Sequence, residues 1–190
     1  MNVGDIIKTL GYTVQWLEWG IVNEAYLESQ YAGYFRSDDK NQEHYRCRAF
    51  RDFICRSSSL TDDVIDKVFL LRDDGPDGCD LTSNRVIELI LSGILSDEQH
   101  FALANRQRSV LDRPIGKLYE RESLLRKVRR TGLAANLSEI QASSDSFIQL
   151  SLLDHPDLAR VHLQWLQGCG ANKSIRNRAE ALLRSKRFRE

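Results

Sequence analysis

Three segments of the sequence share the pattern of a helix start, and they recur at a spacing typical of paired helices. They read Leu60-Thr61-Asp62-Asp63, Leu95-Ser96-Asp97-Glu98 and Leu137-Ser138-Glu139. A Ser or Thr side chain caps the free N–H groups of a first turn, and the acids that follow lie against the positive end of the helix dipole. The starts lie 35 residues apart (60 to 95) and 42 residues apart (95 to 137). This is the length of a two-helix repeat unit.

Helices are expected along the whole chain, because strand-like alternation is hard to find and the sequence holds only three prolines. Gly93, Gly132 and Gly168 stand where the second helix of each pair would end. Pro114 and Pro156 suit the first turn of a helix, where the missing N–H costs nothing. The longest loop is predicted at residues 72–80, and a short first helix is predicted to end at Gly11. The predicted helices lie at about 4–10, 13–35, 42–56, 62–71, 82–93, 97–109, 114–131, 138–153, 156–167 and 174–187.

The last predicted helix resembles the second helix of a HEAT-type repeat through the segment Ser174-Ile175-Arg176-Asn177-Arg178-Ala179-Glu180-Ala181-Leu182-Leu183. Such helices favour an apolar residue, an arginine and then small and leucine positions. The resemblance covers residues 60–187 and implies stacked helical hairpins that hold another molecule on their surface. The predicted fold is therefore all-α, either irregular stacked helical hairpins of this HEAT-like kind or a compact multi-helix bundle. We expect a single helical domain over residues 1–190, with aromatic-rich helices over 1–58 and helical pairs over 60–187.

The two halves of the chain carry opposite charge. Residues 1–100 hold 10 Lys and Arg against 18 Asp and Glu, a balance of −8. Residues 101–190 hold 17 against 9, a balance of +8. This asymmetry indicates either a binding surface or two halves that attract each other.

A reduced, cytoplasmic environment is expected from several absences in the sequence. No apolar run approaches the roughly 18–20 residues that span a bilayer, and no secretory signal precedes the first predicted helix. The cysteines lack the spacing of a disulfide framework, which favours free thiols. They are Cys47, Cys55, Cys79 and Cys169.

The helix expected over residues 13–35 would have two apolar faces. At about 100° per residue, one arc holds small and branched residues and a nearly opposite arc holds aromatic ones. Either both arcs are buried between neighbouring helices, or the aromatic arc binds a partner or a second copy of the chain, because Trp and Tyr are enriched as interface anchors. The candidate protein-binding residues are Tyr12, Trp16, Trp19 and Tyr26, with nearby charge from Asp38, Asp39 and Glu43. Tyr31, Tyr34 and Phe35 extend the same helix.

A basic stretch from Arg106 to Arg130 suggests nucleic-acid binding as an alternative. Its helical wheel angles scatter the cations, whereas a helix that follows phosphates shows a coherent stripe. Exposure to solvent or pairing with acids is therefore the favoured interpretation of this stretch. The candidate nucleic-acid-binding residues are Lys117, Arg121, Arg126, Lys127, Arg129 and Arg130.

Patterns typical of catalysis or metal binding are sparse. Cys169 lies between two glycines as a possible nucleophile, but the sequence identifies no His or carboxylate partner for it. His44 and Cys47 lack the further ligands that zinc needs. No Gly-rich phosphate loop or dinucleotide fingerprint occurs. We therefore expect no catalytic residues, no metal and no cofactor.

The sequence thus predicts a non-catalytic, cytoplasmic protein-binding module. It would act as an adaptor, or as an immunity-type or antitoxin-type inhibitor of a partner protein. A helical nucleic-acid-binding protein that uses residues 101–190 is the alternative. A cysteine-dependent enzyme is the weakest alternative, and no membrane partner is expected.

Overall fold

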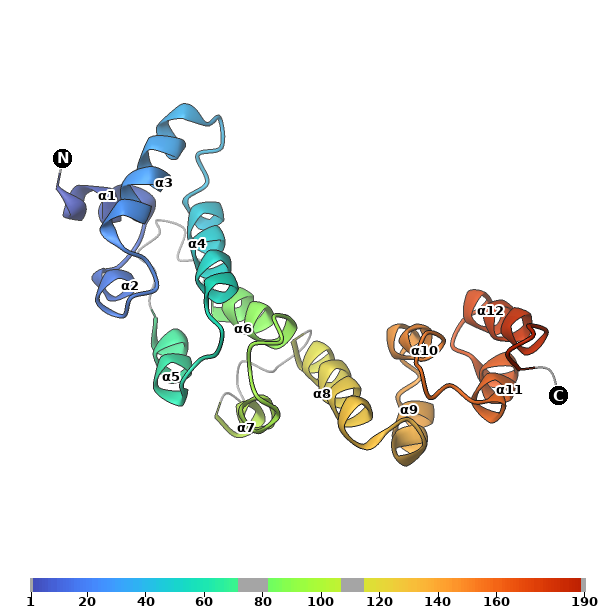
Figure 1. Ribbon diagram of the computed structural model, residues 1–190. Helices are drawn as coiled ribbons and strands as arrows, with labels where there is room; N and C mark the ends of the chain where they lie inside the picture. The colour runs from blue at the N-terminus through green and yellow to red at the C-terminus, as the bar shows by residue number, and fades with distance from the viewer. Residues whose placement is uncertain (1, 72–81, 107–114, 189–190) are drawn as a thin grey trace. The chain divides into compact units, whose positions relative to one another are not determined.

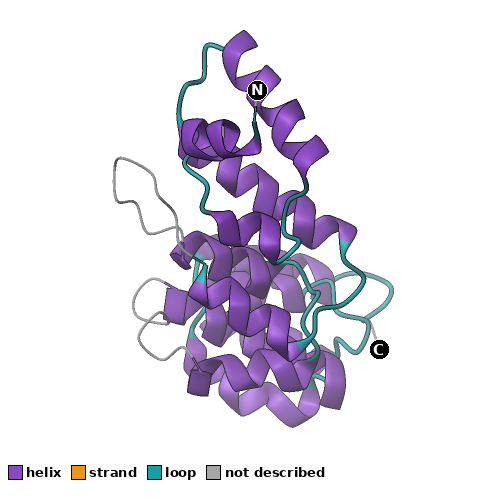
Figure 2. Cartoon of the chain, turned by 90° about the vertical axis from the view of Figure 1, so that its left-hand side faces the viewer, coloured by secondary structure: helices purple, strands orange, loops and turns teal. Residues whose placement is uncertain are grey.

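The computed structural model describes residues 2–71, 82–106 and 115–188, and every regular element in these ranges is a helix (Figures 1 and 2). The all-α prediction is confirmed. No helix in the described ranges is both long and apolar enough to cross a membrane. The helices are α1 (Val3–Leu10), α2 (Val14–Glu18), α3 (Glu24–Arg36), α4 (Gln42–Arg56), α5 (Asp62–Leu70), α6 (Thr82–Leu91), α7 (Asp97–Arg106), α8 (Ile115–Thr131), the 3₁₀ turn η1 (Ala134–Asn136), α9 (Leu137–Ser143), α10 (Ser146–Leu152), α11 (Arg160–Cys169) and α12 (Lys173–Leu183).

The chain divides into two compact units, residues 1–118 and 119–190, and the division falls inside α8. The sequence predicted a change, from aromatic-rich helices to helical pairs, much earlier in the chain, between residues 58 and 60. The single-domain expectation stays a prediction, and each unit is described by itself. The expected loop at 72–80, with Cys79, lies outside the described residues, as do Pro114 and residues 107–109.

In residues 1–118, α4 connects the first helices with the later ones. It packs against α1 and α6, while α1 also contacts α3 and α6 also contacts α5. The inward side chains are nearly inaccessible to water, which is where most of the stability of an amphipathic helix arises. Those below 2% exposure include Ile6, Leu10, Leu27, Phe50, Ile65, Val68, Leu89 and Ile90.

The single helix expected over residues 13–35 is wrong, because two helices, α2 and α3, occupy this range. Gly20 adopts a left-handed conformation (φ +71°), which glycine tolerates because it has no Cβ. The N–H of Val22 bonds back to the carbonyl of Trp16 (3.1 Å). Asn23 then caps α3 with its side chain. The two opposite arcs expected for a continuous helix therefore do not form.

Two of the three expected helix starts are confirmed. Thr61 caps α5 with its hydroxyl (3.4 Å). Before α7, Ser96 Oγ accepts from the N–H of Gln99 (3.2 Å), and Gln99 Oε1 accepts from the N–H of Ser96 (3.0 Å), which is a reciprocal capping box. At the third start, α9 begins within one residue of the prediction, but the expected hydroxyl cap from Ser138 is wrong. Helix α9 follows η1 directly and begins at Leu137, so Ser138 lies inside its first turn.

The predicted end of the first helix is confirmed at Gly11. This residue has φ +68° and its N–H bonds to the carbonyl of Lys8 (3.3 Å). The guanidinium of Arg46 lies directly over Gly11, so a Cβ atom there would collide with Arg46 Nη1.

Gly93 and Gly132 also adopt positive φ (+70° and +85°) just beyond α6 and α8, as expected. Gly168 does not end its helix, because α11 continues to Cys169. The chain leaves α11 instead at Gly170, which is buried against Ile175 and has φ −58°.

Residues 119–190 form a second core, built mainly by α8 to α12. Helix α11 packs against α12, and α10 also contacts α12. The core consists of Leu124, Val128, Leu133, Ile140, Ile148, Leu152, Leu153, Leu158, Leu163, Leu166, Ile175, Ala179 and Phe188.

The helix expected over residues 138–153 is also two helices, α9 and α10. Ser144 has φ +50° between them. The carboxylate of Asp145 then accepts from the N–H groups of Phe147 (2.8 Å) and Ile148 (3.1 Å) and so starts α10. A short polar side chain that caps the backbone interrupts a continuous helical pattern.

The sequence predicted a helix that starts at Pro156, but α11 starts four residues later, at Arg160. The imidazole of His162 caps this helix, because its Nδ1 accepts from the N–H of Ala159 (3.0 Å). The Nδ1 of His155 similarly accepts from the N–H of Asp157 (3.2 Å). Burial, and then the neighbouring His155, hold the pKa of His162 below its usual value.

Candidate functional site

The structure places Tyr12 and Trp16 in the core rather than on an aromatic binding face. Each is only 1% exposed, and their rings meet edge to face with centroids 4.9 Å apart. The hydroxyl of Tyr12 donates to Gln30 Oε1 (2.5 Å). The expected role of Trp16 as an exposed anchor is therefore wrong.

Trp19 and Tyr26 are half-buried. The Tyr26 hydroxyl donates to Asp52 Oδ2 (2.7 Å) and accepts from Gln30 Nε2 (3.0 Å). The guanidinium of Arg56 lies 5.5 Å from the centre of the Tyr26 ring. Burial, followed by the hydrogen bond to Asp52, raises the pKa of Tyr26 far above its ordinary value. Tyr26 thus joins α3 to α4.

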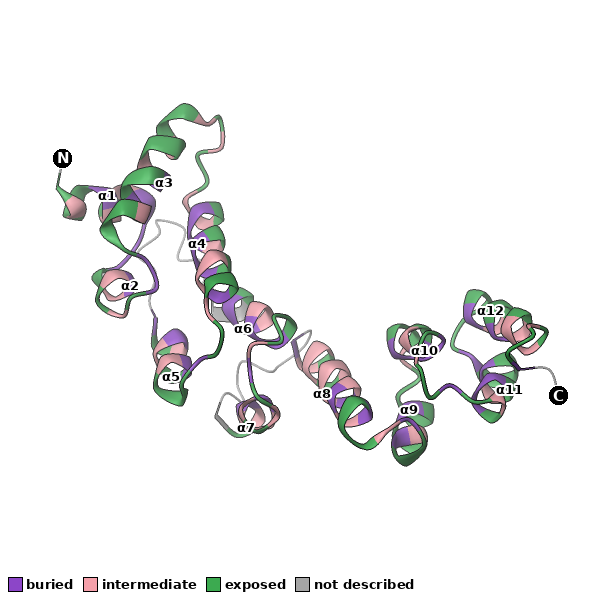
Figure 3. Ribbon diagram, in the orientation of Figure 1, coloured by how far each residue is buried: buried purple, intermediate pink, exposed green. Residues whose placement is uncertain are grey.

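The exposed aromatic residues of residues 1–118 lie near the C-terminal end of α3, a helix whose ribbon is coloured largely as exposed in Figure 3. Phe35 is 59% exposed and packs on the rings of Tyr31 (4.6 Å between centroids) and Tyr34 (5.5 Å). Lys40 Nζ lies 4.9 Å from the centre of the Tyr34 ring. Beyond Gln30 none of the α3 residues is buried. We call Tyr31, Tyr34 and Phe35 the aromatic end of α3.

The three expected acids lie around the connection between α3 and α4. Asp38 is exposed, and Glu43 is half-buried in the first turn of α4. Asp39 Oδ2 lies 2.9 Å from His44 Nδ1. This contact, and then the N–H of Asn41 on Asp39 Oδ1, hold the pKa of Asp39 below its ordinary value.

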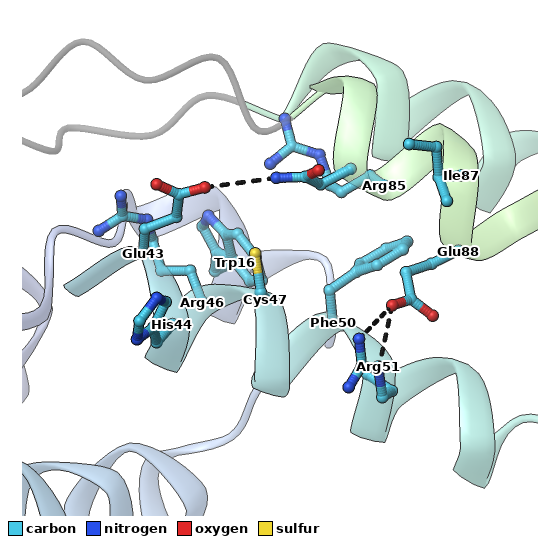
Figure 4. A pocket seen from close by; sticks show the side chains of 11 residues that line it. Trp16, Glu43, His44, Arg46, Cys47, Phe50, Arg51, Arg85, Ile87 and Glu88 are labelled. Atoms are coloured by element: carbon cyan, nitrogen blue, oxygen red, sulfur yellow. Dashed lines mark hydrogen bonds and ion pairs between the residues drawn. The ribbon is translucent and has the colours of Figure 1, made fainter. Parts of the chain in front are cut away.

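A hollow of about 290 Å³ lies between α4 and α6 (Figure 4). Trp16 and Phe50 are each 1% exposed and form its floor. Cys47 and Ile87 are half-buried and line its walls. One predicted binding residue, Trp16, thus lies beneath a surface depression instead of on a helix face.

Two polar contacts between α4 and α6 border this hollow (Figure 4). At one border Asn84 Nδ2 donates to Glu43 Oε1 (3.3 Å). At the other, Arg51 donates from Nε (3.0 Å) and Nη2 (2.5 Å) to Glu88 Oε1. The side chain of Arg51 is 63% exposed and that of Glu88 is 29% exposed. The Arg51–Glu88 pair is therefore accessible from solvent.

Two buried arginines fix the walls of the hollow to the core below. Arg46 is 2% exposed and donates from Nη1 to the carbonyl of Leu10 (2.9 Å). Arg85 is 3% exposed and donates from Nη2 to the carbonyl of Leu71 (2.8 Å). The guanidinium of Arg85 also lies 5.9 Å from the centre of the Trp16 ring. These bonds hold α4 and α6 in place on either side of the hollow.

A second, more open hollow of about 460 Å³ continues along the same two helices. Ile54 and Cys55 line it from α4, and Leu91, which is 58% exposed, lines it from α6. Arg51 and Glu88 line both hollows, so their ion pair marks the boundary between them. We call the two hollows and this ion pair the α4–α6 groove.

The sequence contained one indication of this groove, an excess of apolar residues in α6, that the prediction of a helix there did not use. Residues 86–91 read Val-Ile-Glu-Leu-Ile-Leu, so α6 is apolar on more than one face. Val86, Leu89 and Ile90 are fully buried, whereas Ile87 and Leu91 face the groove. Apolar residues beyond those needed for the core indicate a second apolar surface.

The cations proposed for nucleic-acid binding are largely engaged with acids. Lys117 and Arg130 are exposed. The other four, all in residues 119–190, form ion pairs with acids, and one of them, Arg126, is itself buried. The pairs are Arg121–Asp145 (3.0 Å), Lys127–Glu139 (2.7 Å), Arg126–Glu122 (3.8 Å) and Arg129–Glu122.

The proposed nucleophile, Cys169, is exposed at the end of α11. His162 lies seven residues earlier on the same helix, which places it about 10 Å away along the axis. At that separation the two side chains are too far apart to form a hydrogen bond. In the described ranges no group of three or more His, Cys, Asp and Glu residues is arranged to hold a metal ion.

No protein-family model matches the chain, and comparisons with curated proteins and with solved structures found no match.

Proposed function

We propose that the chain is a non-catalytic protein-binding module that holds its partner in the α4–α6 groove. The observation that carries this proposal is the pair of adjoining hollows, whose apolar lining reaches the surface at Leu91. An apolar depression with a polar rim is typical of a protein-binding surface. Trp16 and Phe50 support the depression from below, which keeps its shape fixed before binding.

A protein suits this groove better than a nucleic acid. Its rim carries both signs of charge, with Arg51 paired to Glu88 at one border and Glu43 at the other. Residues 1–100 also have a balance of −8, which repels phosphates. The acids paired with the cations on α8 further reduce the attraction of that helix for a phosphate backbone.

An adaptor and an inhibitor of a partner protein both fit the proposal, since each needs only a stable binding surface. The resemblance of residues 174–183 to a HEAT-type helix agrees with it, because stacked helical pairs commonly hold partners. A reducing, cytoplasmic location is part of the same proposal. Cys47 and Cys55 line the groove and are free thiols.

Site-specific photocrosslinking in native lysate tests the proposal. A benzophenone amino acid at Leu91 lies in the groove, and one at the exposed Glu98 of α7 serves as the matched control. We expect a protein adduct from position 91 and not from position 98. It should survive nuclease treatment and disappear when excess unlabelled chain competes.

Two results would contradict the proposal. The first is an adduct that forms equally from both positions, because the groove would then have no special role. The second is recovery of RNA or DNA that nuclease removes together with the adduct, which would favour the nucleic-acid alternative.

Self-association through the aromatic end of α3 is a second candidate interaction, because Phe35 is 59% exposed on an aromatic cluster. Light scattering over a concentration series tests it. We expect any dimer to be lost in Phe35→Glu and retained in the crosslinking variant at Leu91. A monomer at every concentration would exclude self-association.

A further inference from the structure

The occupant of the groove can be specified further from the spacing and chemistry of the two hollows. We propose that it is an amphipathic helix of another protein, with one large apolar side chain in each hollow and a carboxylate beside Arg51. This inference rests on the proposed function, because it names the partner of the same groove.

The walls of the groove favour a helical occupant over an extended peptide. Both walls are α-helices, whose central N–H and C=O groups bond within the helix. An extended peptide gains its affinity mainly from main-chain bonds to an open strand edge. Here the two helical walls offer no strand edge, so the backbone groups of such a peptide would depend on scattered polar side chains for their hydrogen bonds. A helix satisfies its backbone internally and offers only side chains.

The separation between the hollows accommodates two anchors from one helix. Cys47 and Cys55 each line one hollow from α4, eight residues or about 12 Å apart. Ile87 and Leu91 each line one hollow from α6, four residues or about 6 Å apart. Positions i and i+7 of a partner helix lie on one face and about 10 Å apart, within this range. Positions i and i+4 lie only about 6 Å apart, at the lower end of this range.

The Arg51–Glu88 pair determines which charge the partner helix carries between its two apolar anchors. Arg51 uses its Nε and Nη2 edge for one oxygen of Glu88, and the side chain is 63% exposed. A guanidinium carries five N–H donors, so its Nη1 side can receive a second carboxylate. An acid at i+3 or i+4 of the partner lies on the same face as the two anchors. The expected motif is therefore apolar, acidic, apolar over eight residues.

Selection from two displayed libraries tests this inference on the full chain. One library varies the exposed face of a stable single helix, and the other consists of linear peptides with central prolines. Binders are kept only if Leu91→Glu weakens them, which shows that they use the groove. We expect the helix library to dominate, with large apolar residues at i and i+7 and Asp or Glu between them.

Charge reversal then tests the carboxylate. Arg51→Glu should weaken the selected helices about tenfold or more, and changing their acid to Lys should restore binding. Arg51→Gln, which avoids repulsion with Glu88, should show a smaller loss in the same direction. Arg48→Glu is the matched control: Arg48 is exposed on α4 and lines neither hollow. Thermal melts establish that each variant is folded.

The outcomes separate this inference from the proposed function. Groove-dependent binders that are linear, or that bind Arg51→Glu unchanged, would overturn the helical motif and leave the groove as a binding site. Binders that all ignore Leu91→Glu, or a failure of both libraries, would overturn both proposals.

Discussion

Replacement of Trp16 by alanine separates a core tryptophan from an interface anchor. The side chain is 1% exposed, so nearly all of the roughly 150–250 Å² that an aromatic residue buries is removed from water. At about 25 cal/mol per Å² the lost burial corresponds to ~4–6 kcal/mol, which is an upper estimate because unfolded chains are partly compact. The edge-to-face contact with Tyr12 and the nearby Arg85 guanidinium add to the loss, whereas collapse around the cavity reduces it. We expect Trp16→Ala to lower the free energy of unfolding by about 3–5 kcal/mol.

Urea unfolding followed by far-ultraviolet circular dichroism measures this change. Trp16→Phe keeps an aromatic ring beside Tyr12 and should lose less. Trp19→Ala, at a half-buried position just after α2, serves as the control and should cost about 1–2 kcal/mol. A loss below about 1 kcal/mol for Trp16→Ala, together with loss of partner binding, would refute the placement of Trp16 in the core.

Three further predictions concern local structure. Gly11→Ala should destabilise the protein more than Gly20→Ala, by about 1–3 kcal/mol. Both glycines have positive φ, but only at Gly11 would the new methyl group meet the guanidinium of Arg46. Thermal melts compare the two variants. The lowered pKa of His162 means that its neutral form is preferred in the fold, so this stabilisation is full above the unfolded value of about 6.5 and is lost as pH falls through the folded pKa. Urea unfolding at several pH values should show that loss in the wild type and less of it in His162→Gln. Asp145→Ala should lower the free energy of unfolding by roughly 1–2 kcal/mol, because it removes the cap of α10. Asp154→Ala, which removes only an exposed ion pair, should change it by no more than about 0.5 kcal/mol. Equal losses in the two variants would contradict the capping role of Asp145.

Local chemistry made much of the secondary structure predictable. Thr61 and Ser96 cap helices because a hydroxyl followed by acids satisfies the first turn whatever surrounds it. Gly11, Gly93 and Gly132 take the left-handed conformation for an equally local reason. The two wrong predictions, continuous helices over residues 13–35 and 138–153, each overlooked an interruption signal of the same local kind. Gly20 with Asn23, and Ser144 with Asp145, each stop one helix and start another.

The candidate site was predictable only in part. The sequence singled out Trp16 and Glu43 as candidate binding residues, and both line the α4–α6 groove, although Trp16 lies in the core rather than on an aromatic helix face. It gave no reason to place them with Ile87 and Glu88, because α6 meets α4 only through tertiary packing. The apolar excess of residues 86–91 indicated an extra apolar face but not what lies opposite it.

The sequence by itself therefore determined that the chain is helical and where most helices begin and end, since capping, glycine conformation and periodicity act over a few residues. Which aromatic residues are buried was decided by tertiary structure. Trp16 and Trp19 are only three positions apart, yet the first is in the core and the second is half-exposed, because the turn at Gly20 redirects the chain and α4 and α6 close over Trp16. The groove has the same origin. It exists because two helices far apart in sequence pack side by side, and burial depends on what a residue meets in space.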